Sequence, residues 1–512
     1  MSLLPQNSPY IPILISIFLI IIIAFSRKKF KASQNNIAPG PWKLPIIGNL
    51  HQLIGPLPHR LLSNLANQYG PIMHLQLGEV SAIVISSPEA AKEILKTHDL
   101  SFANRPNVVA ADIMSYGNLG IGFTPYGDYW RQMRKICMLE LLSGKRVMSF
   151  RSIREEEVWS FVDSLTQSSH LGVAVNLSQK LFSLTNDIVA RAAFGKKCKD
   201  QDELMSLVNE VRKVSGGFDI PDVFPSLKFL GFVTGMVPAL KKIHRKLDKN
   251  LDNIVNDHKA AKLLLSSDCS TSPNGVEEDI IDLLLKLGES GEIEFDITTT
   301  HIKAVAMDIF SAGSETSATT IEWAITELLR HPRVIKKAQA EVRKVMQGKS
   351  KLEEKEIENK LTYLKSVIKE TLRIHPPVTL IPRESREECE INGYKIPNKT
   401  KLLINAWAIG RDPSHWGEDV ESFRPERFES NSIDFKGNSF ELVPFGGGRR
   451  ICPGISFGVA VVELVLSQLI YHFDWEVVES NKQVDAVESF GITCRRKNDL
   501  ILIPTIPFSV DI

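Results

Sequence analysis

The sequence predicts a mainly α-helical fold with a small β-sheet region, in which one globular domain follows an N-terminal membrane-spanning helix. Apolar residues recur at helical spacing along most of the chain, strand-like segments are few and short, and the N-terminus carries a long uncharged apolar run. We expect a membrane anchor over residues 1–30, a basic and proline-rich hinge over 31–57, and a single globular domain over 58–512.

The apolar run covers residues 10–25. About 16 helical residues span roughly 24 Å, slightly short of a thin endoplasmic-reticulum bilayer near ~27 Å. Basic residues follow the run between positions 27 and 31, and positive charge keeps that side of an anchor in the cytosol. Because no small-residue cleavage site follows, we expect a retained single-pass anchor in the endoplasmic reticulum membrane. A cleaved signal peptide is the alternative.

Periodicity places the main elements of the globular domain. Helical spacing is found at 158–165, 181–194 and 279–287, and longer helices are expected over 301–330 and 455–469. Strand-like segments are found at 72–77, 82–85 and 401–404. The first two are separated by Gly78 and Glu79, which predicts a hairpin.

Charge and cysteine content exclude some classes of function. Lys and Arg number 61 and Asp and Glu 60, so the net charge of +1 gives no support to nucleic-acid binding. The six cysteines show neither a C-x-x-C motif nor zinc-site spacing, which favours free thiols in a reducing compartment. The glycine-rich segment 117–122 has the wrong order for a dinucleotide fingerprint, so we interpret it as a loop.

Residues 444–454 read Pro-Phe-Gly-Gly-Gly-Arg-Arg-Ile-Cys-Pro-Gly directly before an apolar helix. A metal-binding thiolate needs a low pKa, and a helix N-terminus supplies free N–H groups and a positive dipole end. The glycines of the loop omit side chains where a flat cofactor would lie. Phe445 can shield the sulfur of Cys452 from water, and Arg450 can reach a carboxylate of the cofactor.

The pattern F-x-x-G-x-R-x-C-x-G in this loop resembles the signature of the cytochrome P-450 superfamily. The resemblance implies a single-domain cytochrome P-450 fold and haem b, whose iron is bound by Cys452 as the proximal ligand. It also implies a monooxygenase that inserts one oxygen atom from O2 into a small apolar substrate and reduces the other to water. The electrons would come from NADPH through a separate NADPH-cytochrome P-450 reductase, with cytochrome b5 as a further candidate partner.

Three further motifs resemble the same family. Glu370 and Arg373 lie one helical turn apart, and Arg427 in the Pro-Glu-Arg-Phe segment completes the family's buried Glu–Arg–Arg network. Such a network is structural and would lock the cysteine loop beneath the haem.

The segment Ala312-Gly-Ser-Glu-Thr316 resembles the family's oxygen-binding groove. The Thr316 hydroxyl can bond to a carbonyl one turn earlier and bend the helix. By resemblance, Thr316 and Glu315 are the catalytic residues that hold and relay protons.

The third motif resembles the family's W-x-x-x-R, in which Trp130 and Arg134 bind a haem propionate. Arg383 lies where related enzymes place another propionate ligand.

Basic residues near these motifs suggest a docking face for the reductase, and plain solvated charge is the alternative interpretation. Its candidate residues are Arg131, Lys135, Lys145 and Arg146.

The Pro-Gly-Pro hinge at 39–41, the Pro-Arg-Glu-Ser run at 382–385 and the cysteine loop resemble the plant A-type enzymes, especially the 71 family. This resemblance implies an apolar specialised metabolite as substrate, with a terpenoid or an alkaloid favoured. The expected substrate pocket is apolar. It comprises Ile302, Ala306, Phe310, Ala312, Val378, Ile381, Phe490 and Ile492.

Two alternatives remain at this point. The same fold can act as a reductase-independent isomerase or dehydratase, although such relatives generally lose the acid and the threonine found here at 315 and 316. A membrane haem protein for electron transfer is the other alternative, and it would need neither Thr316 nor an open groove.

Overall fold

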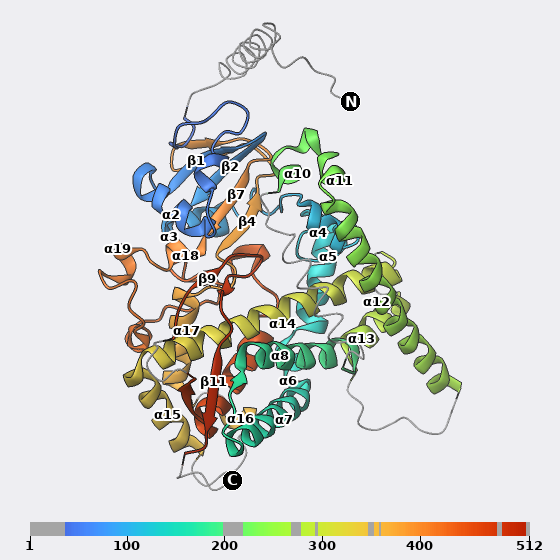
Figure 1. Cartoon of the computed structure of the whole chain (residues 1–512). Helices are drawn as coiled ribbons and strands as arrows, with labels where there is room; N and C mark the ends of the chain where they lie inside the picture. The colour runs from blue at the N-terminus through green and yellow to red at the C-terminus, as the bar shows by residue number, and fades with distance from the viewer. Residues whose placement is uncertain are drawn as a thin grey trace, which may run out of the picture.

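The computed structural model describes residues 36–197, 219–267, 278–291, 295–346, 353–357, 360–478 and 484–507. The expected anchor over 1–30 and the first residues of the expected hinge lie outside the described residues. The described chain forms a mainly helical body with small sheets. The long helix α14 (Thr299–Arg330) crosses the middle of this body (Figure 1).

The helices expected from periodicity are present and extend beyond the expected segments. They are α7 (Arg151–His170), α8 (Leu177–Phe194), α13 (Ile280–Ser290) and α20 (Ile455–His472). The others are α2 (Pro58–Tyr69), α3 (Pro88–Lys92), α4 (Val109–Met114), α5 (Asp128–Ile136), α6 (Gly144–Ser149), α10 (Ile220–Val223), α11 (Leu230–Val233), α12 (Met236–Ser267), α15 (Pro332–Met346), α16 (Glu354–Ile357), α17 (Thr362–Ile374), α18 (Ala406–Ile409) and α19 (Pro413–Trp416).

Local sequence explains where the site-bearing helices begin and end. Thr298 caps α14 in a capping box with His301. Helix α17 ends at Ile374, because Pro376 disfavours helical geometry in the residue before it. Segment 117–122 is a loop, as expected, and it leads into α5.

A four-stranded sheet packs beside α2, α3 and α18 (Figure 1). Its strand order is β1 (Ile72–Leu77), β2 (Val80–Ile85), β7 (Lys401–Asn405) and β4 (Leu380–Glu384). The predicted hairpin joins β1 to β2, and its turn residue Gly78 has a φ of +61°. Strands β2 and β7 are parallel, whereas β4 is antiparallel to β7 and carries Arg383 opposite Leu402.

Three smaller sheets complete the fold. One has the order β3 (Val175–Asn176), β11 (Ile501–Thr505) and β8 (Asp474–Val477). The other two are the pairs β5 (Cys389–Ile391) with β6 (Tyr394–Ile396), and β9 (Glu488–Ser489) with β10 (Arg495–Arg496). The β9–β10 hairpin brings the C-terminal loop against α14.

The largest hydrophobic cluster is built around α7, α8, α14, α17 and α20. Within the described residues, α20 is the one helix long and apolar enough to cross a membrane, and 67% of its apolar window is buried inside the protein. A Cβ atom on Gly458 of α20 would lie 3.7 Å from the Ser317 Oγ atom of α14. Helix α20 is therefore packed as a core helix, and it places the cysteine loop beside α14.

Candidate active site

The cysteine loop, residues 444–454, closes on itself before α20. The Cys452 amide donates a hydrogen bond to the Phe445 carbonyl at 3.0 Å. The Phe445 ring packs edge-on against Phe435 with a centroid distance of 5.2 Å. The Cys452 side chain remains partly exposed. The loop therefore presents a thiol at the start of α20, with an aromatic ring nearby.

Two glycines of this loop serve a different purpose from the one expected. Gly448 has a φ of +63°, and a Cβ atom there would lie 2.3 Å from the Leu95 carbonyl oxygen. A Cβ atom on Gly447 would lie 3.2 Å from the Leu95 side chain. These glycines allow close approach of the segment Glu93–Thr97, so they do not clear space for a flat cofactor.

The surroundings of Cys452 act on the pKa of its thiol in both directions. Burial raises the pKa of Cys452, while the Gly454 amide and the positive charge of Arg134 partly oppose that rise. Gly454 caps α20, so Cys452 lies two residues before the N-cap of the helix. Ionisation of this thiol is therefore coupled to metal binding, as for other thiolate ligands.

Four arginines meet beside the cysteine loop: Arg105, Arg134, Arg383 and Arg450. Of the described carboxylates, none forms a hydrogen bond or an ion pair with these four groups. Burial and the neighbouring positive charges lower the pKa of Arg105, Arg383 and Arg450. Sequence reasoning missed Arg105, because its place in the cluster depends on a contact with the distant Pro382 carbonyl.

Backbone carbonyls accept hydrogen bonds from these arginines. Arg450 donates to Ala103 at 2.8 Å, to Thr124 at 2.5 Å and to Ile121 at 3.3 Å. Arg383 is 1% exposed and donates Nη2 to Gly447 at 2.8 Å, but its Nη1 atom is buried without a partner. The negative charge of Asp99 acts on Arg383 and Arg450 without bonding either of them. A buried unpaired donor next to this surplus of positive charge indicates a place for an anionic group.

Trp130 and Arg134 lie on one face of α5, as the spacing of four residues predicted. The buried Trp130 ring stacks beneath the Arg450 guanidinium at 4.1 Å. Its Nε1 atom donates to the Ile121 carbonyl at 3.1 Å, while Arg134 donates to the Ile451 carbonyl. Helix α5 is thereby joined to the residue that precedes Cys452.

On α14, the Thr316 hydroxyl donates to the Ala312 carbonyl at 2.7 Å, as expected. Ala312 is exposed and Thr316 is partly exposed on this helix. Glu315 is buried, and its carboxylate accepts a hydrogen bond from the Thr493 hydroxyl of the C-terminal loop. Sequence reasoning missed Thr493, since no local motif marks it.

The structure brings Glu370, Arg373 and Arg427 together. Arg373 bonds both oxygens of Glu370, at 2.7 and 2.8 Å, and Arg427 Nε lies 3.4 Å from Glu370 Oε1. Arg373 also donates to the carbonyls of Gly410, Val420 and Ser422. The three charges thus join α17 to the segment that follows α18.

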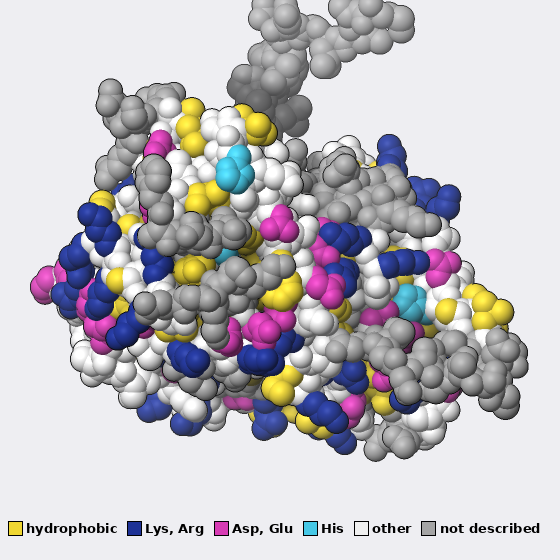
Figure 2. Space-filling model, turned by 90° about the horizontal axis from the view of Figure 1, so that it is seen from below, with side chains coloured by type: hydrophobic (Ala, Val, Ile, Leu, Met, Phe, Trp, Pro, Cys, Tyr) yellow, Lys and Arg dark blue, Asp and Glu magenta, His cyan; other side chains and the backbone are white. Residues whose placement is uncertain are grey.

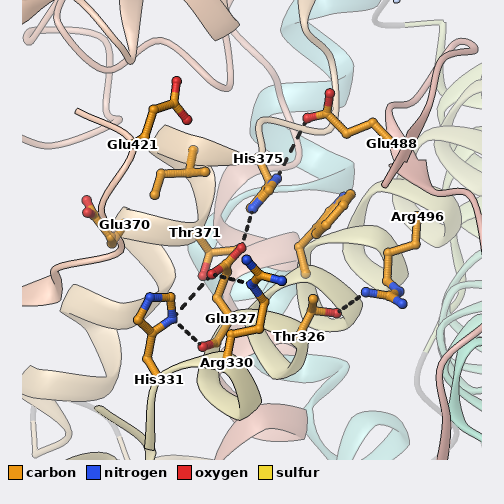
Figure 3. A network of polar contacts seen from close by, with 12 residues as sticks. Thr326, Glu327, Arg330, His331, Glu370, Thr371, His375, Glu421, Glu488 and Arg496 are labelled. Carbon is orange, nitrogen blue, oxygen red and sulfur yellow. Dashed lines mark hydrogen bonds and ion pairs between the residues drawn. The ribbon is translucent and has the colours of Figure 1, made fainter. Parts of the chain in front are cut away.

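His375 lies at the end of α17 between two acidic side chains (Figure 3). Its Nε2 atom bonds Glu327 of α14 at 2.9 Å, and its Nδ1 atom lies 3.9 Å from Glu488 of β9. The ring stacks flat on Trp323 at a centroid distance of 3.9 Å. His375 is therefore a packing residue that joins three elements behind the site.

The expected pocket residues fall into two groups. Ile302, Ala306 and Phe310 are buried in the main core, where Phe310 packs 5.4 Å from Phe194 of α8. Ala312 and Ile492 are exposed, Val378 and Phe490 are partly exposed, and Ile381 is buried. Gly313 faces α8, because a Cβ atom there would lie 3.2 Å from Val189. The accessible face of α14 is the one that carries Ala312.

A hollow of about 280 Å³ opens beside the cysteine loop. Its lining contains four basic side chains and no acidic one: Tyr126, Trp130, Arg131, Arg134, Lys135, Met138 and Arg449. Two of the expected docking residues, Lys145 and Arg146, do not line it. Figure 2 shows basic and acidic side chains interspersed over one face of the molecule.

These residues fit haem b. The Cys452 thiol is suited to bind the haem iron, and the arginine cluster with the orphaned Arg383 Nη1 atom is suited to the two propionates. The exposed Ala312 of α14 leaves the side of the site opposite Cys452 free of a large side chain. Glu315 and Thr316 on the same helix supply a carboxylate and a hydroxyl.

Comparison with known proteins identifies the family. Residues 38–503 match the sequence profile of cytochrome P450. The chain is 54% identical to a melianol synthase of Melia azedarach, over 97% of this chain and 99% of that protein. It is 51% identical to a premnaspirodiene oxygenase of Hyoscyamus muticus, over 96% and 98%.

A solved structure agrees with these relatives. A zebrafish cytochrome P450 determined with abiraterone superposes with a TM-score of 0.72 and 25% identity, over 88% of this chain and 100% of that one. The chain therefore belongs to the cytochrome P450 family, in the plant 71 branch, and is a haem-thiolate monooxygenase.

Proposed function

We propose that this enzyme oxidises a terpenoid skeleton, with Cys452 as the axial ligand of the haem iron. The observation that carries the site assignment is the surplus of positive charge next to the Cys452 loop, where four guanidinium groups meet and the negative charge of Asp99 acts on Arg383 and Arg450 without bonding them. Four guanidinium groups without a described carboxylate partner match a dianionic cofactor and would be destabilising without one. No other group of described residues combines a thiol with such a surplus of positive charge.

Bound haem supplies oxygen activation, which thiolate donation favours by promoting O–O cleavage. The residues of this chain have separate tasks. Arg105, Arg134, Arg383 and Arg450 would hold the propionates, and Phe445 would limit access of water to the sulfur. The Thr316 hydroxyl donates its proton to the Ala312 carbonyl and can rotate to donate it elsewhere. The Glu315 carboxylate provides a second oxygen that can carry a proton.

The substrate class rests on the relatives and on the apolar residues near the groove. Melianol synthases of several plants and a premnaspirodiene oxygenase are among the most similar proteins, and both names denote terpenoid chemistry. A desmethyl-deoxy-podophyllotoxin synthase of Sinopodophyllum hexandrum is 51% identical, which supports a lignan as the second candidate class. Val378, Ile381, Phe490 and Ile492 offer apolar contacts to either skeleton.

A carbon monoxide difference spectrum tests the ligand. The reduced wild-type protein should show the thiolate-type band, and Cys452→Ala should lose it. Cys137→Ala is the matched control, because Cys137 is a fully buried core thiol outside the loop. Membranes that contain the chain and reductase should then convert triterpenoid or sesquiterpenoid substrates when NADPH is supplied. Conversion of lignans alone would contradict the terpenoid proposal.

We further propose that residues 1–30 anchor the enzyme in the endoplasmic reticulum membrane, with the catalytic domain over 58–512 in the cytosol. An exposed apolar surface supports this: Trp42, Ile46, Ile54, Phe229, Phe232 and Val233. The first three of these residues form one half of the surface, and the last three form the other. Both halves adjoin the β1–β2 turn, where the Gly78 amide donates to the Ile47 carbonyl and the Glu79 amide donates to the Val223 carbonyl. Large exposed apolar patches mark membrane or partner contacts.

Glycosylation tests this orientation. The sequons at Asn176 and Asn398 should carry no glycan in plant microsomes, although Asn398 lies in an exposed turn. A glycan on either residue would place the domain in the lumen. The full chain should resist alkaline extraction, and a chain that lacks residues 1–30 should still bind vesicles through Phe229, Phe232 and Val233.

Reductase, with cytochrome b5 as a second partner, is proposed to dock at the basic hollow. Lys135 and Arg131 line it, and Arg134 connects it to the carbonyl before Cys452. Lys135→Glu should raise the KM for reductase and weaken its salt dependence, because complementary charge governs the encounter rate. Lys145→Glu, outside the hollow, is the control and should have a smaller effect.

A further inference from the structure

The glycine-rich segment 117–122 carries no cofactor fingerprint, yet its end lies between α14 and the arginine cluster. The Asp308 Oδ2 atom of α14 accepts hydrogen bonds from the Ile121 amide at 2.7 Å and from the Gly122 amide at 3.0 Å. Asp308 lies one turn before Ala312, on the helix that carries Thr316.

The carbonyls of the same loop point to the cationic side. The Ile121 carbonyl accepts from Trp130 Nε1 at 3.1 Å and from Arg450 Nη1 at 3.3 Å. The Gly122 carbonyl accepts from Arg105 Nε at 3.2 Å. The peptide unit that joins Ile121 to Gly122 is therefore bonded at both ends: its N–H donates to the Asp308 carboxyl group, and its carbonyl accepts from Trp130 and Arg450.

This alignment is electrostatically favourable at both ends. The Asp308 carboxyl oxygen attracts the positive end of this peptide dipole, and the Arg450 guanidinium attracts its negative end. Without the carboxylate, two amides would lose their acceptor and the loop would lose the contact that sets its orientation. The carbonyls that orient Trp130, Arg450 and Arg105 would then lose their fixed positions.

We propose that Asp308 is a positioning residue that orients the 120–124 loop and, through it, the side chains that grip the haem propionates. The proposal rests on the proposed haem site but assigns a residue outside the signature motifs. Asp308 acts through the loop and does not touch the arginines.

Gly120 provides an independent test of the same contact. Its φ lies outside the left-handed region, but a Cβ atom there would lie 2.1 Å from Asp308 Oδ2. Gly120→Ala should therefore displace the carboxylate from the loop while leaving the carboxylate in the chain. In a chain that already lacks the carboxylate, the added methyl group has no oxygen to displace.

The experiment measures haem transfer from the full-length ferric enzyme to excess apomyoglobin, together with the midpoint potential and thermal unfolding. Asp308→Ala should release haem roughly tenfold faster, since two charge-assisted hydrogen bonds are lost. Asp308→Asn keeps a carbonyl acceptor and should be intermediate. Gly120→Ala should resemble Asp308→Ala, and the double variant should release haem no faster than Asp308→Ala alone.

Matched controls separate this role from general destabilisation. Asp222 is also a buried aspartate that accepts a backbone amide, that of Val109 at the start of α4, at 2.9 Å, but it does not bond the loop that carries the arginine contacts. Asp222→Ala should lower the melting temperature without accelerating haem release. Gly144→Ala, where a Cβ atom meets nothing within 4 Å, should change neither quantity.

Two results would overturn the proposal. One is haem release from Asp308→Ala or Gly120→Ala that stays within about twofold of wild type. The other is a double variant in which the increases in the rate of haem release caused by the two substitutions multiply. If Asp308→Ala does not fold, Asp308→Asn and Gly120→Ala still decide the question. Absence of the thiolate band in the wild type would instead refute the proposed haem site.

Discussion

Glu370 and Arg373, one turn apart on α17, form a fully buried two-point ion pair with N–O distances of 2.7 and 2.8 Å. The Arg424 amide also donates to Glu370, at 2.8 Å. The pair thereby joins α17 to the chain segment that leads to the cysteine loop. Neither side chain contacts water, so each charge depends on the other.

Glu370→Ala should lower the free energy of unfolding by about 3–5 kcal/mol, because it leaves a buried guanidinium without its anion. Thermal unfolding and the yield of haem-containing enzyme measure this loss. The control is Arg333→Ala, which removes an ion pair with Glu426 in which the Arg333 side chain is 68% exposed. Its effect should be much smaller, because solvent screens an exposed ion pair. Equal effects of the two variants would contradict the assignment.

Arg383→Met should have opposite effects on the haem-free and haem-loaded protein. It removes a buried charge that is repelled by Arg105 and Arg450, so the haem-free chain should melt at a higher temperature. It also removes a propionate donor, so haem release should accelerate. Calorimetry of the haem-free protein and haem transfer assays measure the two effects. A lower melting temperature of the haem-free variant would count against a site built for an anion.

Thr316→Ala should lower the amount of product formed per NADPH consumed by roughly tenfold, with little change in substrate binding, since a proton-holding hydroxyl is lost. Thr316→Ser should restore most of the coupling. Thr320→Ala is the matched control, because its hydroxyl makes the same backbone bond one turn later, at 2.8 Å to Thr316. If Thr320→Ala uncouples the enzyme equally, bending of α14 is the cause and proton delivery is not.

His258 should make stability depend on alkaline pH. Burial lowers the pKa of His258, but the bond to Asp279 at 2.7 Å and the nearby negative charges outweigh burial and raise it from 6.5 to about 9. The folded state therefore holds the proton more tightly than the unfolded state. The stabilisation is complete below about pH 6.5 and is lost as the pH rises through 9.

The expected loss between pH 7 and 9.5 is about 1–2 kcal/mol, after a discount for solvent screening. Thermal unfolding across this range measures it. His258→Gln should remove this part of the pH dependence and make the protein less stable at pH 7. A His258→Gln curve parallel to that of the wild type would refute the assignment.

Local spacing predicted several parts of the site. Trp130 and Arg134, Glu370 and Arg373, and the Thr316 bond to Ala312 each depend on residues three or four apart on one helix. Helical periodicity places such pairs on one face regardless of the rest of the fold. The β1–β2 hairpin was predicted for the same reason, because its turn residues lie between its strands.

Other parts depended on contacts between distant segments. Arg105 joins the arginine cluster through Pro382, and Thr493 meets Glu315 from the C-terminal loop. Periodicity shows that α14 has an apolar face but not which neighbour covers it, so it did not reveal that Ile302, Ala306 and Phe310 pack in the core.

The sequence by itself determined the family signature, the helix that follows Cys452 and the pairs one helical turn apart, because these depend on short-range geometry. Tertiary structure decided the burial that raises the pKa of the Cys452 thiol, the packing role of Gly448 and the place of Asp308 between α14 and the propionate site. Burial and the electric field at a side chain are sums over all neighbours, and most of those neighbours are remote in the chain.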